Sequence, residues 1–260
     1  MAASAQQPPQ LVEQRAWLTP TEGVGLFMAC AVLFIGASGP LASKGPWGFL
    51  ALDVLAFALP PIVLARLHGA PREILRLAPP SARVWAGAGL VGASMWAVVA
   101  FLVLPIGERL MPAPPQVTQE LQQAVMPTGT AFWVVLVTSA IGPGLCEELL
   151  CRGGLAPALE RGIGRLPAIA ISAMLFALLH LSPYRLLPTF AIGLVLGTLA
   201  LRSRSTLAAM LAHALSNAAI LGIEVAPEAT RHWLEGRTTW LGVAALVPLG
   251  AGLALARKAD

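Results

Sequence analysis

The sequence predicts an all-α, polytopic membrane helix bundle with about eight transmembrane helices. Hydrophobic residues make up 57% of the 260-residue chain and charged residues only 12%, whereas soluble domains carry about 25% charged residues. The mean hydropathy is +0.74, and successive apolar stretches approach the roughly 20 residues that a helix needs to cross a bilayer. These observations exclude a water-facing surface of ordinary polarity, and we expect the lipid bilayer to surround the chain.

The predicted spans begin after a polar segment, Met1–Pro20, that we expect to be a flexible cytoplasmic tail. We expect residues 21–260 to form a single membrane domain. The eight spans are predicted at about Gly23–Ser43, Pro46–Arg66, Val84–Ile106, Thr130 to beyond Glu147, Leu166–Leu181, Leu186–Leu201, Thr206–Ile223 and Trp240–Ala256.

The distribution of basic residues predicts the orientation of the bundle. With the N-terminus in the cytoplasm, eleven Lys and Arg residues fall on the cytoplasmic side and five on the other side, before Arg15 is counted. The five are Lys44, Arg109, Arg185, Arg231 and Arg237. This positive-inside bias predicts that both termini are cytoplasmic. Because no basic run is interleaved with aromatic residues, we expect no nucleic-acid partner.

Few ionisable side chains lie inside the predicted spans. The acids are Asp53, Glu147 and Glu148, and the histidines are His180 and His213. A charged side chain deep in a bilayer costs at least about 2.5–3.5 kcal/mol on insertion scales. These residues are therefore candidates for a functional site, except Asp53, which belongs to no motif and for which a structural or interfacial role is expected.

The spacing of the polar residues predicts which of them share a helix face. Glu147 and Glu148 point about 100° apart, so one carboxylate can face a cavity while the other makes a structural contact. Arg152 follows Glu148 by four residues, a spacing that predicts an ion pair on one face. His213 and Asn217 have the same spacing on another span.

A carboxylate, two imidazoles and an amide from three spans favour hydrolytic chemistry. Peptide hydrolysis needs a base that activates water and donors that stabilise the developing oxyanion. A Glu in an apolar setting suits the first task, and His and Asn side chains suit the second. The same residue types could instead ligate Zn²⁺, which accepts imidazole nitrogen and carboxylate oxygen and keeps a position open for water.

Each of these residues also has a simpler interpretation. The Glu pair can be a solvated helix cap, and His180 can be an interfacial residue at the end of its span. His213 and Asn217 can form hydrogen bonds between membrane helices. Their joint occurrence favours a functional site.

The predicted depths of Glu147 and His180 conflict, because each lies toward a different membrane surface. A shared site requires similar depths. We expect the fourth span to continue toward Glu160, which brings Glu147 near mid-depth, although Pro157 would bend such a helix.

Three motifs in the second half of the chain resemble those of a protease family. The run Glu147–Arg152 resembles the EExxxR motif of the CPBP family (CAAX proteases and bacteriocin-processing enzymes, also called the Abi family). Phe176–His180 is similar to its FxxxH motif, and His213–Asn217 to its HxxxN motif. Phe190 and Gly193 are similar to the aromatic-xx-Gly segment of the family. The order and separations fit, whereas the first three spans match only in kind.

The resemblance implies an intramembrane endopeptidase with a catalytic core at about residues 130–223. In the family, the Glu matching Glu147 activates water together with the His matching His180, and the residues matching His213 and Asn217 form the oxyanion hole. The predicted catalytic residues are thus Glu147, Glu148, His180, His213 and Asn217, supported by Arg152 and Phe176.

The resemblance leaves the cofactor and the substrate open. The family is described both as metalloproteases and as glutamic-type proteases, so Zn²⁺ held by Glu147, His180 and His213 remains an alternative to a metal-free site. Typical substrates are the C-terminal region of a membrane-anchored protein, a prenylated tail or a leader peptide. The compact, Ala- and Leu-rich chain is typical of bacteria, which predicts a multi-pass protein of the bacterial inner (cytoplasmic) membrane.

Two other functions compete with the peptidase. One is a non-enzymatic membrane scaffold or immunity-type protein with the same fold, in which the polar cluster only holds helices together. The other is a proton-coupled transporter, which would require inverted repeats with broken helices. No such repeat is found in the sequence.

Overall fold

The described part of the chain is built from consecutive helices. The computed structural model describes residues 16–235 and 237–257, and these residues contain no strand. Among them, seven helices are long and apolar enough to cross a membrane by length and composition, and one further apolar helix is shorter. This confirms the predicted all-α, polytopic bundle. The expected tail at Met1–Pro20 lies mostly outside the described residues.

The first part of the bundle comprises nine elements, in which η denotes a π-helical segment. They are α1 (Pro20–Ala42), α2 (Pro46–Asp53), η1 (Val54–Ala58), α3 (Leu59–Leu67), α4 (Pro71–Ile74), α5 (Ala82–Val98), η2 (Val99–Val103), α6 (Leu104–Leu110) and α7 (Pro115–Val125).

The second part comprises the remaining ten elements of the described chain. They are α8 (Phe132–Val135), η3 (Leu136–Ile141), α9 (Gly142–Glu148), η4 (Leu149–Leu155), α10 (Ala156–Ile163), α11 (Arg165–Leu178), α12 (Pro183–Ser203), α13 (Thr206–Glu224), α14 (Glu228–Glu235) and α15 (Thr238–Leu255).

Each of the four π-helical segments ends two residues before a proline. These prolines are Pro60, Pro105, Pro143 and Pro157. Proline has no backbone N–H and clashes with the preceding turn, and membrane helices accommodate it by local π adjustments. The helices therefore continue through their prolines, so that α8 to α10 form one run of 32 residues, Phe132–Ile163. The expected extension of the fourth span toward Glu160 is confirmed.

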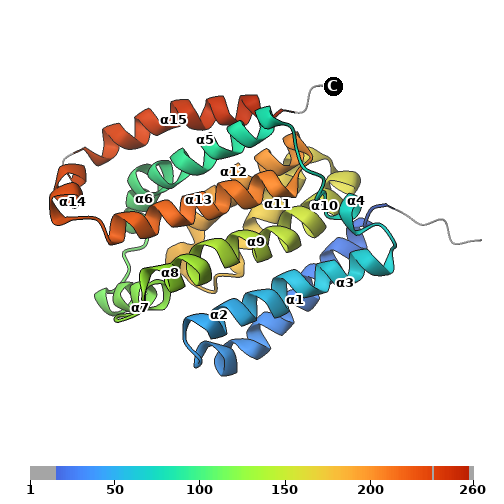
Figure 1. The fold of residues 1–260 in the computed structure, drawn as a ribbon, viewed down its shortest axis with the longest axis horizontal. Coiled ribbons are helices and arrows are strands. Elements are labelled where there is room, and N and C mark those ends of the chain that lie inside the picture. Colours follow the sequence, from blue (N-terminus) through green and yellow to red (C-terminus); the bar gives the residue numbers. More distant parts are fainter. Residues whose placement is uncertain (1–15, 236, 258–260) are drawn as a thin grey trace, which may run out of the picture.

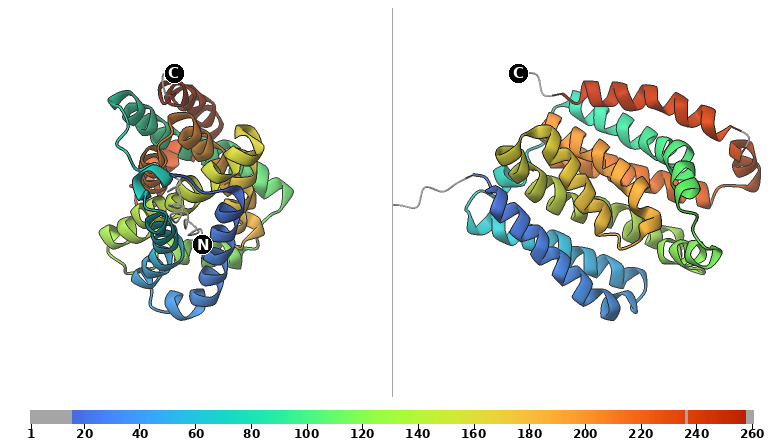
Figure 2. Two further views of the ribbon diagram at one scale, coloured as in Figure 1. Left: turned by 90° about the vertical axis from the view of Figure 1, so that its right-hand side faces the viewer. Right: turned by 180° about the vertical axis from the view of Figure 1, so that it is seen from behind.

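Helix α9, which carries the Glu pair, lies in the middle of the bundle. The pair α1 and α2–α3 lies along one edge, and α15 lies along the opposite edge beside α5 (Figures 1 and 2). Between these edges, α9 contacts α2 on one side and α13 on the other, and α11 packs on α12. Residues from the N-terminal hairpin and from α11 to α13 can therefore reach the same space beside α9.

Large apolar side chains face outward on the edge helices. Met28 and Val32 on α1 are 56% and 68% exposed, and Val247 on α15 is 74% exposed. Extended apolar surface of this kind marks contact with another apolar phase. A bilayer supplies that phase for the seven apolar helices of spanning length among the described residues.

The connections differ from the prediction in three places. Helices α7 and α14 lie in segments that were expected to be loops. Helix α11 ends at Leu178, earlier than expected, because Leu181 adopts a left-handed conformation with φ +49° and Pro183 starts the next helix. Arg185, expected in an outer loop, therefore lies in the first turn of α12.

Candidate active site

The two adjacent glutamates at the end of α9 have different surroundings. The Glu148 side chain is fully buried, with 0% exposure, whereas the Glu147 side chain is 16% exposed and lines a cavity. The π-helical segments η3 and η4 lie on either side of α9, and such segments occur frequently at functional sites. The divergence expected for neighbouring helical residues is thus confirmed.

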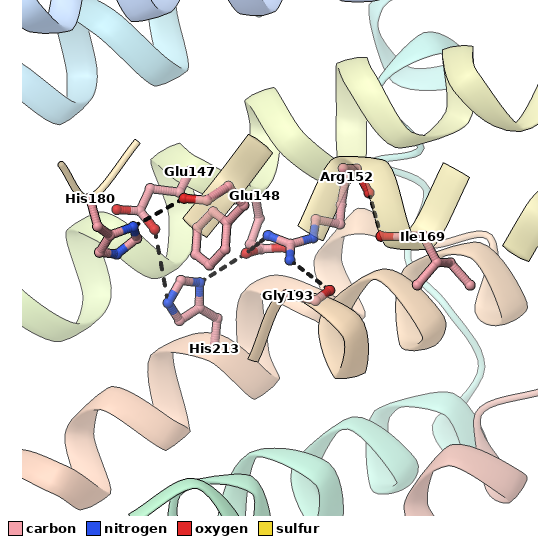
Figure 3. A network of polar contacts seen from close by, with 9 residues as sticks. Glu147, Glu148, Arg152, Ile169, His180, Gly193 and His213 are labelled. Atoms are coloured by element: carbon pink, nitrogen blue, oxygen red, sulfur yellow. Dashed lines mark hydrogen bonds and ion pairs between the residues drawn. The ribbon is translucent and has the colours of Figure 1, made fainter. Parts of the chain in front are cut away.

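Glu148 is the centre of a buried polar network that joins three helices (Figure 3). Its Oε1 accepts hydrogen bonds from Arg152 Nη1 at 2.7 Å and from His213 Nδ1 at 2.9 Å. Arg152 Nη2 donates to the carbonyl of Gly193 on α12 at 3.1 Å. The predicted ion pair between Glu148 and Arg152 is confirmed. The network ties α9–η4 to α12 and α13.

Phe176 packs against three members of the polar cluster. The Arg152 guanidinium lies over its ring, with Cζ 4.6 Å from the centroid. The imidazoles of His180 and His213 contact the same ring edge to face, with centroids 5.1 and 5.9 Å away. The ring is 1% exposed, so it holds the cation and both imidazoles in place without contributing a polar atom.

Glycines allow the helices that carry the site to approach closely. A Cβ on Gly193 would lie 2.8 Å from Ala173 Cβ on α11, and a Cβ on Gly144 would lie 2.8 Å from the Ala214 nitrogen on α13. Both distances are too short for real side-chain carbons. The first contact exposes the Gly193 carbonyl to Arg152, and the second brings His213 within reach of Glu148.

Four of the predicted catalytic residues line one cavity of about 330 Å³, namely Glu147, His180, His213 and Asn217. They come from α9, from the turn after α11 and from α13. His213 Nε2 lies 4.0 Å from Glu147 Oε2. The volume falls in the range of about 300–1,000 Å³ that is typical of ligand pockets. The structure therefore brings these four residues together, whereas Glu148 supports the cavity wall from behind.

The hydrogen bonds of the two histidines assign their tautomers. His180 Nδ1 lies 3.1 Å from the carbonyl oxygen of Phe176, and His213 Nδ1 lies 2.9 Å from the Glu148 carboxylate. Both partners are acceptors, so Nδ1 carries a hydrogen in each ring. In the neutral state, Nε2 of each ring is then a hydrogen-bond acceptor. The cavity thus offers two imidazole nitrogens and a carboxylate that can accept hydrogens from a water molecule.

Two further charged residues line the cavity that sequence reasoning did not assign to a site. Asp53 is 9% exposed at the end of α2, and Arg185 lies in the first turn of α12. Asp53 had been expected to be structural or interfacial, and Arg185 to lie in a loop. Acidic residues are rare within membrane spans, so the place of Asp53 in a predicted span was itself an indication of a functional role. For Arg185 no signal existed, because the span was predicted to start at Leu186, three residues after the observed start of α12 at Pro183.

The cavity residues do not form a metal-ligand group. Among the described residues, no three His, Cys, Asp or Glu side chains gather closely enough to hold a metal ion. His213 Nδ1 is bound to Glu148, and its Nε2 stands 4.0 Å from Glu147. The three side chains expected as alternative Zn²⁺ ligands, Glu147, His180 and His213, therefore do not fit that ion as arranged.

The family comparison covers the segment that contains the site. Residues 129–219 match the family model described as Rce1-like, type II CAAX prenyl endopeptidase. No curated protein and no solved structure matches the chain. The matched segment contains all three motifs, from Glu147 to Asn217. The match confirms the family that the motifs indicated, and over this segment the chain is similar to the Rce1-like CAAX prenyl endopeptidases.

Proposed function

We propose that the chain is a CAAX-protease-like intramembrane endopeptidase, in which Glu147 activates water for attack on a peptide bond. The observation that carries this proposal is the cavity where Glu147 meets His180, His213 and Asn217 inside the apolar bundle. A carboxylate, two imidazoles and an amide are the groups that peptide hydrolysis needs, and few other ionisable residues occur within the spans. The family match of residues 129–219 supports the same reaction class.

Water activation follows from the acceptors that face the cavity. The Glu147 carboxylate and His180 Nε2 each accept one hydrogen of a water molecule, which leaves an oxygen lone pair free to attack the peptide carbonyl. Glu147 takes the proton as the water oxygen bonds to the carbonyl carbon. A positioned general base of this kind contributes typically about 10²–10⁴-fold to a rate.

The developing oxyanion needs donors on the other side of the carbonyl. The Asn217 side-chain amide has two N–H donors whatever its surroundings. Because His213 Nδ1–H donates to Glu148, His213 Nε2 donates only when the ring is doubly protonated. The proposal therefore assigns His213 a doubly protonated ring at this step, with Nδ1–H directed at Glu148 and Nε2–H directed at the oxyanion. His213 and Asn217 can then stabilise the oxyanion together.

Collapse of the tetrahedral intermediate returns the proton. Glu147, now protonated, donates it to the leaving amine nitrogen, so that the C–N bond breaks and a carboxylic acid and an amine form; the acid passes its proton to the amine, and the products leave as a carboxylate and an ammonium ion. Glu147 ends the cycle ionised, as it began. Atoms and charges balance with water as the second substrate.

The proposal also includes the extent of the catalytic core, the class of substrate and the cellular location. We place the catalytic core at about residues 130–223 of one membrane domain, 21–260. The proposed substrate is a membrane-anchored protein or peptide, because the cavity lies among helices of membrane-spanning length. The proposed location is the bacterial inner membrane.

The test is cleavage of a panel of membrane-anchored tail peptides by the purified protein in detergent. We expect wild type to cleave at least one peptide and Glu147→Ala to cleave none, with the same elution volume and unfolding temperature as wild type. Cleavage by Glu147→Ala at the wild-type rate would refute the role of Glu147. Absence of cleavage by wild type, in detergent and after reconstitution, would favour the scaffold function.

A further inference from the structure

The end of the bundle that carries α4 and α10 is rich in arginine, and we call it the basic end (Figure 1). Two contacts join its segments. Arg76 forms an ion pair with Glu160 at 3.2 Å, and the Arg76 carbonyl accepts a hydrogen bond from the Thr206 backbone N–H at 3.2 Å. The described segments at this end hold nine Arg and three Glu, a net charge of +6. They are residues 16–22, 66–83, 160–165, 202–204 and 256–257.

The opposite end of the bundle carries α7 and α14 (Figures 1 and 2). There, Gln122 Nε2 on α7 donates a hydrogen bond to Glu224 Oε2 at the end of α13, at 3.2 Å. The described segments at this end hold five basic and five acidic residues, so their charges cancel. They are residues 43–46, 107–131, 179–185, 224–235 and 237–238.

The difference in charge predicts which end of the bundle faces the cytoplasm. Cytoplasmic connections of membrane proteins carry an excess of Lys and Arg, a rule that holds for connections of up to about 60 residues. All the connections counted here are shorter. Arg152 is not among the nine arginines, because it lies in the buried network around Glu148. We therefore expect the basic end in the cytoplasm and α7 on the other side of the membrane.

The cavity that holds Glu147 extends toward the end that carries α7. Its lining includes Ala124 and Val125 on α7 and Arg185 in the first turn of α12. Ala124 is exposed, so the cavity reaches the surface of the protein there. Among the described residues that line the cavity, none belongs to the segments of the basic end.

Toward the basic end, the cavity is closed by buried side chains. Glu147 is the sixteenth of the 32 residues in the run Phe132–Ile163, and every residue that follows it from Glu148 to Leu159 is buried. Phe176 lines the cavity with a ring that is 1% exposed, and the Arg152 guanidinium packs against that ring. Water and peptide can therefore approach Glu147 from the end that carries α7, but not through the basic end.

We propose that the cavity opens on the side of the membrane opposite the cytoplasm, so that the site acts on peptide segments that have already been translocated. The substrate class rests on the proposed function, which supplies the peptide, whereas the side of the opening rests on the charge asymmetry and the cavity lining. Translocation of the substrate across the membrane must then precede its cleavage. A segment that stays in the cytoplasm does not reach Glu147.

The experiment compares the accessibility of single introduced cysteines to a bulky, membrane-impermeant maleimide. Ser43→Cys lies in the exposed turn after α1, at the end that carries α7, and Ala78→Cys lies at an exposed position of the basic end. In spheroplasts of the producing bacteria, we expect complete labelling of Ser43→Cys. Ala78→Cys should be labelled only after the membrane is permeabilised with detergent.

Wild type serves as the blank, because its three cysteines are buried. Protection of Ser43→Cys together with labelling of Ala78→Cys in intact spheroplasts would overturn the proposed orientation, as would labelling of both variants. The exposed positions Lys44 and Arg83 offer a second pair, Lys44→Cys and Arg83→Cys. This pair replaces a variant that does not accumulate in the membrane or does not react after permeabilisation.

A second measurement follows the substrate. A tail peptide that wild type cleaves in detergent is linked to a sulfonated fluorophore, which keeps it outside intact spheroplasts. We expect cleavage by spheroplasts with wild type and none with Glu147→Ala. Cleavage that begins only after permeabilisation would overturn the proposed opening.

The two measurements separate this inference from the proposed function. Labelling does not depend on catalysis, so the expected labelling without cleavage of any peptide would leave the orientation standing and refute the peptidase. The reversed labelling pattern, with cleavage that depends on Glu147 after permeabilisation, would refute the opening and leave the peptidase standing.

Discussion

Glu147 and Glu148 are neighbours in sequence, but one faces the cavity and the other the bundle interior. Glu148 has no exposed surface and contacts Arg152 and His213, whereas Glu147 is partly exposed to the cavity and stands 4.0 Å from His213. A helix turns by about 100° per residue, and that rotation separates a supporting carboxylate from one that can meet a water molecule. His213 contacts both, so the buried network orients the residue that completes the cavity.

The largest expected effect that tests this comparison comes from Glu147→Gln. This change removes the proposed base and keeps the shape, so we expect turnover of a cleaved peptide to fall by about 10²–10⁴-fold while the unfolding temperature stays at the wild-type value. Glu108→Gln, at an exposed position on α6, is the matched control and should keep full turnover. A loss of thermal stability in Glu147→Gln would contradict the assignment of the supporting role to Glu148 and the cavity-facing role to Glu147.

Arg152→Met probes the buried network. Removal of one partner from a buried ion pair typically costs about 3–5 kcal/mol, because it leaves the other charge uncompensated. We expect a corresponding loss of unfolding free energy in a denaturant titration in detergent. The double variant Glu148→Gln, Arg152→Met should recover part of that loss, and a double variant less stable than Arg152→Met would show that the pair is not the cause.

Asn217→Ala tests the proposed role of Asn217, which lies on the side of α13 that faces the cavity. The change removes one proposed oxyanion donor, for which a loss of about 10²–10³-fold in kcat is expected. The KM and the unfolding temperature should stay near their wild-type values, since Asn217 makes no side-chain hydrogen bond within the described residues. A rise in KM with kcat unchanged would instead assign Asn217 to ground-state binding.

Gly193→Ala tests the helix contact that exposes a carbonyl to Arg152. The added Cβ would lie 2.8 Å from Ala173 Cβ, and overpacking of this kind typically costs about 1–3 kcal/mol. Gly222→Ala is the matched control, because it lies on α13 with open space around it. Thermal unfolding should separate the two variants, and equal unfolding temperatures would show that α11 and α12 adjust freely.

The smallest effect is expected from removal of metal ions. Since the described His, Cys, Asp and Glu residues form no three-ligand group, dialysis against a strong chelator should leave the cleavage rate unchanged. The rate is measured before and after dialysis, and again after addition of Zn²⁺. A rate lost on dialysis and restored by Zn²⁺ would show that Glu147 and the histidines rearrange around a metal.

Local spacing explains why most of the candidate site could be predicted. The i, i+4 relation of Glu148 to Arg152, and of His213 to Asn217, needs only a helix, and the apolar composition made helices the expected structure. Asp53 and Arg185 show the limit of such reasoning, because neither has a polar partner at helical spacing. Their place in the cavity depends on contacts between helices that the local pattern does not encode.

The sequence by itself determined the class of fold, the approximate spans and the pairing of polar residues within each helix, because bilayer thickness and helical periodicity act on local stretches. Only the tertiary structure decided which glutamate faces the cavity and which charged side chains line that cavity with it. The bond from His213 to Glu148 joins residues 65 positions apart and depends on glycines that let three helices approach.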